Sequence, residues 1–358
     1  MNSIIVLDRS TIDKIAAGEV VERPVNVVKE LMENSIDAGA TAISVEISDG
    51  GKKLIRITDN GCGIPEDEVR SAFLRHSTSK IKNAEDLSFV TTLGFRGEAL
   101  SSIAAVADVE ICTKTKDKPY GIIYRISAGS EVSFEEAGLP DGTTIIISNL
   151  FSHVPARLKF LKTSQSEGNS ISDAVEKIAL SHPDIAVKFT NNNGVRLNTS
   201  GNGSLKDVIY TIYGREMTSN ILEINHSSEV LSISGYIGKP EIARGSRAFE
   251  NYFVNGRFVK DKIISGAIEE AYKGYQMKGS FPFTAFNITM EPELLDVNVH
   301  PSKMEIRFYD NEAVYQSVYD AIREVISGRE SIPETRIETR ADELIRKHNA
   351  ALEAERAK

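Results

Sequence analysis

The fold is decided by residues 24–65, which read PVNVVKELMENSIDAGATAISVEISDGGKKLIRITDNGCGIP. Pro24 suits the first turn of a helix, and apolar residues then recur at helical spacing. At about 100° per residue, Glu30, Asn34 and Asp37 share the opposite side of this helix. The segment therefore predicts an amphipathic helix with an acidic, amide-bearing face. Its apolar positions are Val25, Val28, Leu31, Met32 and Ile36.

The rest of this stretch predicts a β-hairpin that ends in a glycine-rich turn. Residues 42–48 and 53–58 alternate apolar and polar side chains, and Asp49-Gly50-Gly51 joins them. The second strand ends at Asp59, and Asn60-Gly61-Cys62-Gly63 follows as a turn. A carboxylate thus stands at the end of a strand, directly before two glycines.

Further along the chain, two polar segments precede a second helix. Residues 75–80 read RHSTSK, and residues 93–100 read LGFRGEAL and run into a helix of small residues over 101–107. Helix-opening loops mixed with strands predict an α+β or mixed α/β fold for the first half. The strands are expected at 109–113, 120–126 and 143–148.

The second half has a different character and predicts a smaller α+β domain. A hairpin with Asn191-Asn192-Asn193-Gly194 at its turn precedes the polar stretch 198–204, where we place a boundary. We therefore expect domains at 1–200 and 205–330, followed by a charged linker at 331–358. Strands are expected at 229–237, 250–254 and 283–290, and helices at 263–272 and from Glu312 onward.

Composition limits the classes of function. The 358 residues carry 42 Lys and Arg against 51 Asp and Glu, so the net charge is −9. This charge argues against nucleic-acid binding through bulk charge, although it leaves room for a local basic groove. Only two cysteines, Cys62 and Cys112, are present, which excludes a disulfide framework and a cysteine zinc site. No apolar run is long enough for a membrane span, so we expect a cytoplasmic protein.

The polar groups of the first half suit a nucleotide site of an unusual kind. A Walker A pattern is absent, and Gly61-Cys62-Gly63 lacks the setting of a Rossmann fingerprint. Glu30 is placed to activate a water, and Asn34, one helical turn later, to ligate Mg²⁺. Asp59 is placed to accept a hydrogen bond from an exocyclic amine such as that of adenine, and residues 94–100 to offer N–H groups to phosphates. Singly, each pattern is also typical of a solvated helix face, a turn or a helix cap.

Together these motifs resemble the N-terminal ATPase region of the MutL mismatch-repair family. That family belongs to the GHKL class with DNA gyrase B, Hsp90 and histidine kinases. The resemblance implies an α+β fold in which a Bergerat-type α/β sandwich precedes a smaller domain of ribosomal-protein-like fold. It covers residues 1 to about 330, with GFRGEAL at 94–100 as its most specific motif. The matching stretches are 15–24, 29–40, 59–64, 75–80, 93–100 and 296–303.

The resemblance also implies roles for individual residues, with ATP and Mg²⁺ as cofactors. Glu30 would be the general base, Asn34 the Mg²⁺ ligand, and Lys303 a catalytic sensor of the γ-phosphate. Asp59 and Thr143 would lie at the adenine. The expected nucleotide contacts are Asn34, Asp37, Asp59, Gly61, Gly63, Thr78, Ser79, Lys80, Gly94, Phe95, Arg96, Gly97, Glu98, Ala99, Leu100 and Thr143.

The function implied is Mg²⁺-dependent ATP hydrolysis that gates dimerisation in mismatch repair. The implied partners are a second copy of the chain on ATP binding, a MutS-like mismatch-recognition protein, and single- or double-stranded DNA bound weakly and without sequence specificity. No membrane partner and no nuclease site are expected, and the protein would associate with the nucleoid during repair. The candidate DNA contacts are Arg157, Lys159, Lys162, Arg257, Lys260 and Lys262.

Two alternatives stay open at this point. In one, ATP is a structural clamp that assembles two chains on DNA, and hydrolysis only resets it. In the other, the chain is a gyrase-B-like topoisomerase ATPase subunit. The stretches 94–100 and 296–303 favour the MutL family over gyrase B.

Overall fold

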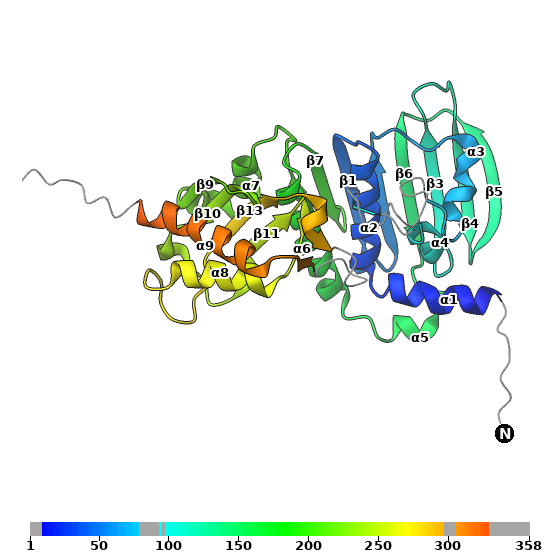
Figure 1. The fold of residues 1–358 in the computed structure, drawn as a ribbon. Coiled ribbons are helices and arrows are strands. Elements are labelled where there is room, and N and C mark those ends of the chain that lie inside the picture. The colour runs from blue at the N-terminus through cyan, green and yellow to red at the C-terminus, as the bar shows by residue number, and fades with distance from the viewer. Residues whose placement is uncertain (1–8, 79–92, 95–96, 297–305, 329–358) are drawn as a thin grey trace, which may run out of the picture.

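The computed structural model describes residues 9–78, 93–94, 97–296 and 306–328. Within them the chain forms two β-sheets with helices packed on them, which confirms the expected α+β fold (Figure 1). The larger sheet lies toward one end of the molecule with the blue helices against it, and the smaller sheet lies toward the other end. In the part of the chain so described, no helix is long and apolar enough to cross a membrane.

The larger sheet has eight strands. They are β1 (Ala42–Ser48), β2 (Leu54–Asp59), β3 (Asp108–Lys114), β4 (Gly121–Ser127), β5 (Ser130–Ala137), β6 (Gly142–Ser148), β7 (Ala186–Asn191) and β8 (Gly194–Asn198). Their order is β5-β4-β3-β6-β2-β1-β7-β8, and only the β1–β7 pair is parallel. The predicted hairpins β1–β2 and β7–β8 are both confirmed, whereas the pattern of β5, which is largely exposed, does not predict a strand.

Helices pack on one face of this sheet. They are α2 (Pro24–Asp37), α4 (Ala99–Ala104) and α6 (Ser164–Ser181), and α1 (Arg9–Val20) packs on α4. On β1 the side chains of Ile43, Val45 and Ile47 are buried beneath the helices, while Ser44 points to the other face. Shorter helices are α3 (Glu66–Val69), α5 (Pro155–Leu158), η1 (Asp49–Gly51), η2 (Ser71–Phe73), η4 (Pro240–Ile242), η5 (Arg247–Phe249) and η6 (Pro292–Leu294).

The smaller sheet has five strands in the order β12-β11-β13-β10-β9. They are β9 (Ile221–Ser227), β10 (Ser232–Gly238), β11 (Glu250–Val254), β12 (Arg257–Phe258) and β13 (Thr284–Thr289). Helices α8 (Lys262–Tyr272) and α9 (Asn311–Ser327) pack on one face through a core that includes Tyr252, Phe286 and Ile288. Two further strands, β14 (Leu295–Asp296) and β15 (Arg307–Phe308), pair with each other, and Lys303 between them lies outside the described residues.

The other face of the smaller sheet shares a core with the larger one. Helix α6 and α7 (Leu205–Thr218) lie between the sheets, and neither was expected from the sequence. Val175 of α6 and Ile209 of α7 belong to the same apolar cluster as Phe253 and Phe283 of the smaller sheet. The two sheets are therefore joined by packed side chains, and the domain boundary at 200–205 stays a prediction.

Replacing Phe283 with Ala should lower the free energy of unfolding by about 3–5 kcal/mol, because truncating the side chain leaves a cavity in the shared core. Phe283 is 1% exposed, whereas Phe160 is 87% exposed, so Phe160→Ala is the matched control and should change little. Urea unfolding followed by circular dichroism measures both variants. A Phe283→Ala protein that is as stable as the control would contradict the shared core.

Candidate active site

Helix α2 carries the central residues of the predicted site, and its start is well defined. Pro24 occupies the first turn, and Asn26 Oδ1 accepts a hydrogen bond from the Arg23 N–H at 2.9 Å. The buried side of the helix comprises Val27, Val28, Leu31 and Met32. Glu30, Asn34 and Asp37 are half-buried, so the expected polar face exists outside the main core.

Asp59 ends β2 directly beside this helix. Its Oδ2 accepts a hydrogen bond from Ser35 Oγ of α2 at 2.8 Å, and its Oδ1 accepts one from the Gly61 N–H at 2.9 Å. Burial raises the pKa of the Asp59 carboxyl above its ordinary value, although hydrogen bonds from Gly61, Ser35 and the Thr143 backbone act in the opposite direction. Asp59 is thus a fixed, partly desolvated acceptor at the edge of α2.

Thr143 lies opposite Asp59 in the β2–β6 register and is only 8% exposed. Its Oγ1 is 3.1 Å from Thr113 Oγ1 of β3, and Thr113 Oγ1 also accepts a hydrogen bond from the Ile64 N–H at 2.8 Å. Thr113 therefore holds the glycine-rich turn against the sheet. The sequence alone does not point to Thr113, because it looks like any strand threonine until the register is known.

The glycine-rich turn is required by the packing of the chain itself. Gly63 has φ of 74°, and a Cβ there would lie 2.2 Å from the Lys114 carbonyl oxygen. The close neighbour of Gly63 is therefore the end of β3. The expected contacts of Gly61 and Gly63 with the nucleotide stay predictions.

Asp37 joins α2 to the second glycine-bearing loop. Its Oδ1 accepts a hydrogen bond from the Leu93 N–H and its Oδ2 one from the Gly94 N–H, both at 3.0 Å. Both carboxylate oxygens of Asp37 therefore hold the loop backbone. Glu98 follows in the same loop, and α4 begins at Ala99, so the expected helix-opening loop is present.

The two polar segments predicted to hold phosphates come together. Gly97 has φ of 63°, and a Cβ there would lie 2.5 Å from the Ser77 carbonyl oxygen, so the two backbones touch. His76 Nδ1 lies 3.1 Å from Glu98 Oε1. Thr78 is half-buried next to this contact. Four expected nucleotide contacts, Ser79, Lys80, Phe95 and Arg96, lie outside the described residues.

The donor set around α2 fits a magnesium nucleotide better than a metal held by protein alone. In the described ranges, no group of three or more His, Cys, Asp or Glu side chains converges as a metal cage. Mg²⁺ prefers oxygen ligands and commonly takes them from one or two side chains together with substrate phosphates. The Asn34 amide on α2 offers such an oxygen.

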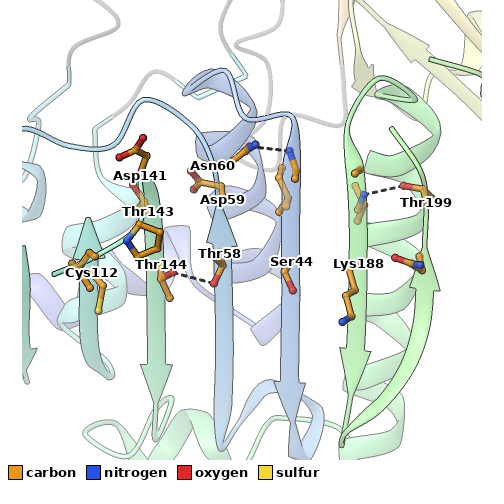
Figure 2. Close-up of a pocket in the computed structure, with 18 residues that line it drawn as sticks. Ser44, Thr58, Asp59, Asn60, Cys112, Asp141, Thr143, Thr144, Lys188 and Thr199 are labelled. Carbon is orange, nitrogen blue, oxygen red and sulfur yellow. Dashed lines mark hydrogen bonds between the residues drawn. The ribbon is translucent and has the colours of Figure 1, made fainter. Parts of the chain in front are cut away.

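A hollow of about 400 Å³ lies on the other face of the larger sheet (Figure 2). Its lining includes Ser44, Thr58, Thr144 and Lys188, which stand in front of the strands while the helices lie behind them. Asp59 reaches its rim, because the end of β2 borders both faces. The hollow thus shares Asp59 and Thr143 with the predicted nucleotide contacts, while Ser44, Thr58 and Lys188 line it on the face away from α2.

One of the candidate DNA contacts, Arg257, is buried, although the sequence analysis expected it on the surface. Arg257 is only 8% exposed and cannot line an open groove, whereas Lys260 and Lys262 are exposed. Charge along a sequence says nothing about burial, and a buried arginine is rare enough that a surface was the natural expectation.

Two family models match the chain. Residues 22–140 match "Histidine kinase-, DNA gyrase B-, and HSP90-like ATPase", and residues 209–327 match "DNA mismatch repair protein, C-terminal domain". The first match covers α2, the glycine-rich turn and the loop at 93–100. The second covers most of α7, the smaller sheet and α9.

Relatives and solved structures agree with these matches. The DNA mismatch repair protein MutL of Agathobacter rectalis is 59% identical over 339 residues, which are 95% of this chain and 52% of that protein. The chain thus spans about half the length of the curated relatives it matches. A crystal structure of the N-terminal domain of a DNA repair protein superposes with a TM-score of 0.76 at 26% identity, over 89% of this chain and 98% of that one.

The Aquifex aeolicus MutL ATPase domain complexed with ADP has a similar fold, with a TM-score of 0.57 at 23% identity over 84% of this chain and 98% of that one. These likenesses favour MutL over the gyrase-B alternative, since the relatives and structures named above are MutL or DNA repair proteins, whereas gyrase B is named in the description of the broad ATPase model. The chain therefore belongs to the MutL family of DNA mismatch-repair proteins and corresponds to the N-terminal ATPase region of that family.

Proposed function

We propose that this chain binds ATP with Mg²⁺ at the polar face of α2 and hydrolyses it, and that the nucleotide state gates dimerisation. The observation that carries the proposal is the position of α2 between two anchors. Ser35 binds Asp59 on one side, and Asp37 binds the backbone of Leu93 and Gly94 on the other. An acceptor for adenine and a loop for phosphates are thereby held at opposite edges of one helix.

Adenine recognition rests on Asp59. Asp59 can only accept hydrogen bonds when ionised, and Ser35, Gly61 and the Thr143 backbone occupy three of its roughly four lone-pair sites. The site that is left favours the exocyclic amine of adenine, because guanine presents a carbonyl oxygen at that position. Thr143 closes the site from β6, since it lies opposite Asp59. The remaining proposed contacts with the nucleotide come from Gly61, Thr78, Gly94 and the start of α4.

Catalysis rests on Glu30, one turn before Asn34 on α2. Glu30 takes the proton of the attacking water, and Asn34 supplies an amide oxygen to the metal. Bound Mg²⁺ supplies charge neutralisation at the phosphate oxygens. Lys303 senses the terminal phosphate from the second domain. In this proposal residues 1–200 form the ATPase domain, residues 205–330 form the second domain, and residues 331–358 form the linker.

The ATPase in turn serves mismatch repair in the cytoplasm, at the nucleoid. ATP brings two chains together, and a MutS-like recognition protein and DNA are the partners of the assembled form. DNA is bound weakly through exposed cations such as Lys159, Lys162, Lys260 and Lys262, so the affinity falls as salt is raised. Clamp formation without chemistry is the second candidate, and it predicts full dimerisation with a non-hydrolysable ATP analogue.

Glu30→Gln should reduce kcat for ATP hydrolysis by about 100-fold or more, since general-base catalysis contributes about 10²–10⁴. The dissociation constant for a non-hydrolysable ATP analogue should change only a few-fold, because the base acts in the transition state. Glu46→Gln is the control, since Glu46 lies on the other face and pairs with Arg56 at 2.8 Å. Equal losses of binding and turnover would refute the base assignment.

Asp59→Asn should weaken ATP binding about tenfold or more and leave the unfolding temperature unchanged or raised. The pKa of Asp59 is raised by burial, so above that pKa the ionised carboxylate lowers stability, and this loss is relieved as pH falls through the folded pKa. In the variant, the new amide donates to Ser35 Oγ, which can still donate to the Leu31 carbonyl oxygen at 3.1 Å.

Calorimetric titration with ATP measures the change in affinity that Asp59→Asn causes, and thermal unfolding measures the change in stability. Both are done at about pH 7.5 and again about one unit higher, where the wild-type carboxyl is more fully ionised. Asp173→Asn serves as the control, because Asp173 is an exposed partner of Lys177 on α6. Unchanged ATP affinity, or a marked loss of stability without nucleotide, would refute the adenine role of Asp59.

A further inference from the structure

Arg257 reaches the larger sheet's helices from the smaller sheet. It begins β12, pairs with Val254 of β11, and is 8% exposed. Buried arginines need carboxylate or carbonyl partners, because a desolvated guanidinium is otherwise unfavourable. The position of Arg257 therefore calls for acidic groups around it.

The β11–β12 hairpin is docked firmly onto α6. The Gly256 N–H donates to Asn287 Oδ1 at 3.0 Å, and the turn at Gly256 lies against the ring of His182, where α6 ends. One residue after Arg257, the Phe258 ring lies 4.5 Å from Lys177 Nζ of α6. The residues on both sides of Arg257 thus lie against α6.

The acidic groups around Arg257 are those of α2. Burial lowers the pKa of Arg257, and the charges of Glu33, Asp37 and Glu30, in that order, act in the opposite direction. Glu33 is itself only 7% exposed and also lies 3.7 Å from Lys29 Nζ. The three carboxylates whose charges act on Arg257 include both the proposed base, Glu30, and Asp37, which anchors the loop at 93–94.

We propose that Arg257 is a positioning residue of the ATPase site, which fixes the acidic face of α2 from the smaller sheet. The proposal rests on the proposed function of that site. Arg257 compensates Glu33 and Asp37, so that Asp37 keeps its two N–H partners in the loop and Glu30 stays oriented toward the substrate. The smaller sheet then acts on the phosphate loop through Arg257, α2 and Asp37.

An arginine suits this position better than a lysine. Its planar guanidinium presents five N–H donors and can serve carboxylates from more than one helical turn, whereas an ammonium is a compact point charge. Glu33 and Asp37 are separated by one helical turn, so a fork of donors can reach both. A purely structural ion pair would stabilise the fold without altering the loop or the reaction.

The test compares Arg257→Met with Arg257→Lys and with the control Arg247→Met. Arg247 is also an arginine of the second half that pairs with carboxylates, but its partners are Glu269 of α8 and Glu250 of β11, which are not on α2. The first readout is amide hydrogen exchange of Leu93 and Gly94 in the protein without nucleotide, and the second is kcat and KM for ATP. We expect Arg257→Met to speed exchange at least tenfold and lower kcat at least tenfold, with KM changing less than threefold, and Arg257→Lys to fall between.

A folded Arg257→Met protein with wild-type exchange and kcat would overturn the proposal, as would equal effects in Arg247→Met. If Arg257→Met does not fold, the double variant Glu33→Gln, Arg257→Met removes the buried cation together with its first carboxylate, and the same two readouts decide. Because exchange is measured without nucleotide, it tests Arg257 even if the wild-type chain fails to hydrolyse ATP. That failure would instead reject the proposed function.

Discussion

Helix α2 must meet two demands at once, and the rest of the structure follows from them. One side has to pack on the larger sheet through Val27, Val28 and Leu31, while the other has to carry carboxylates and an amide. The hydrogen bond from Ser35 to Asp59 couples the two demands, since it fixes the end of β2 to the helix. The loop at 93–94 is then positioned from the same helix through Asp37.

The arrangement around α2 keeps two ionisable groups, Asp59 and Arg257, in buried positions where their charged forms lower the stability of the fold. Asp59 has a raised pKa because it is buried, and Arg257 has a lowered one for the same reason. Both groups are tolerated because the surrounding core is large and shared between the sheets. Groups held at such a cost in free energy are expected at functional sites, where activity and stability favour different residues.

The sequence predicts α2 and the β1–β2 hairpin well, because their apolar residues recur with the periods of a helix and a strand. It misses α6, whose first turns read SQSEGNS and are dominated by serine, glycine and asparagine, which are weak helix formers. Yet both sheets pack on α6. Motifs are sufficient to propose Glu30, Asn34 and Asp59 as site residues. Thr113 and Arg257 cannot, because their importance comes from register and burial, which only the assembled chain defines.

Hydrogen exchange of the wild-type chain, with and without a non-hydrolysable ATP analogue and Mg²⁺, tests the location of the site most directly. The account predicts that the analogue slows exchange of the amides of Gly61, Leu93 and Gly94. The Gly61 amide donates a hydrogen bond to Asp59, and the other two donate to Asp37 of α2. Amides of Thr144 and Lys188, in the hollow on the other face, should stay unchanged. Protection of Thr144 and Lys188 with none at Gly61, Leu93 and Gly94 would contradict it.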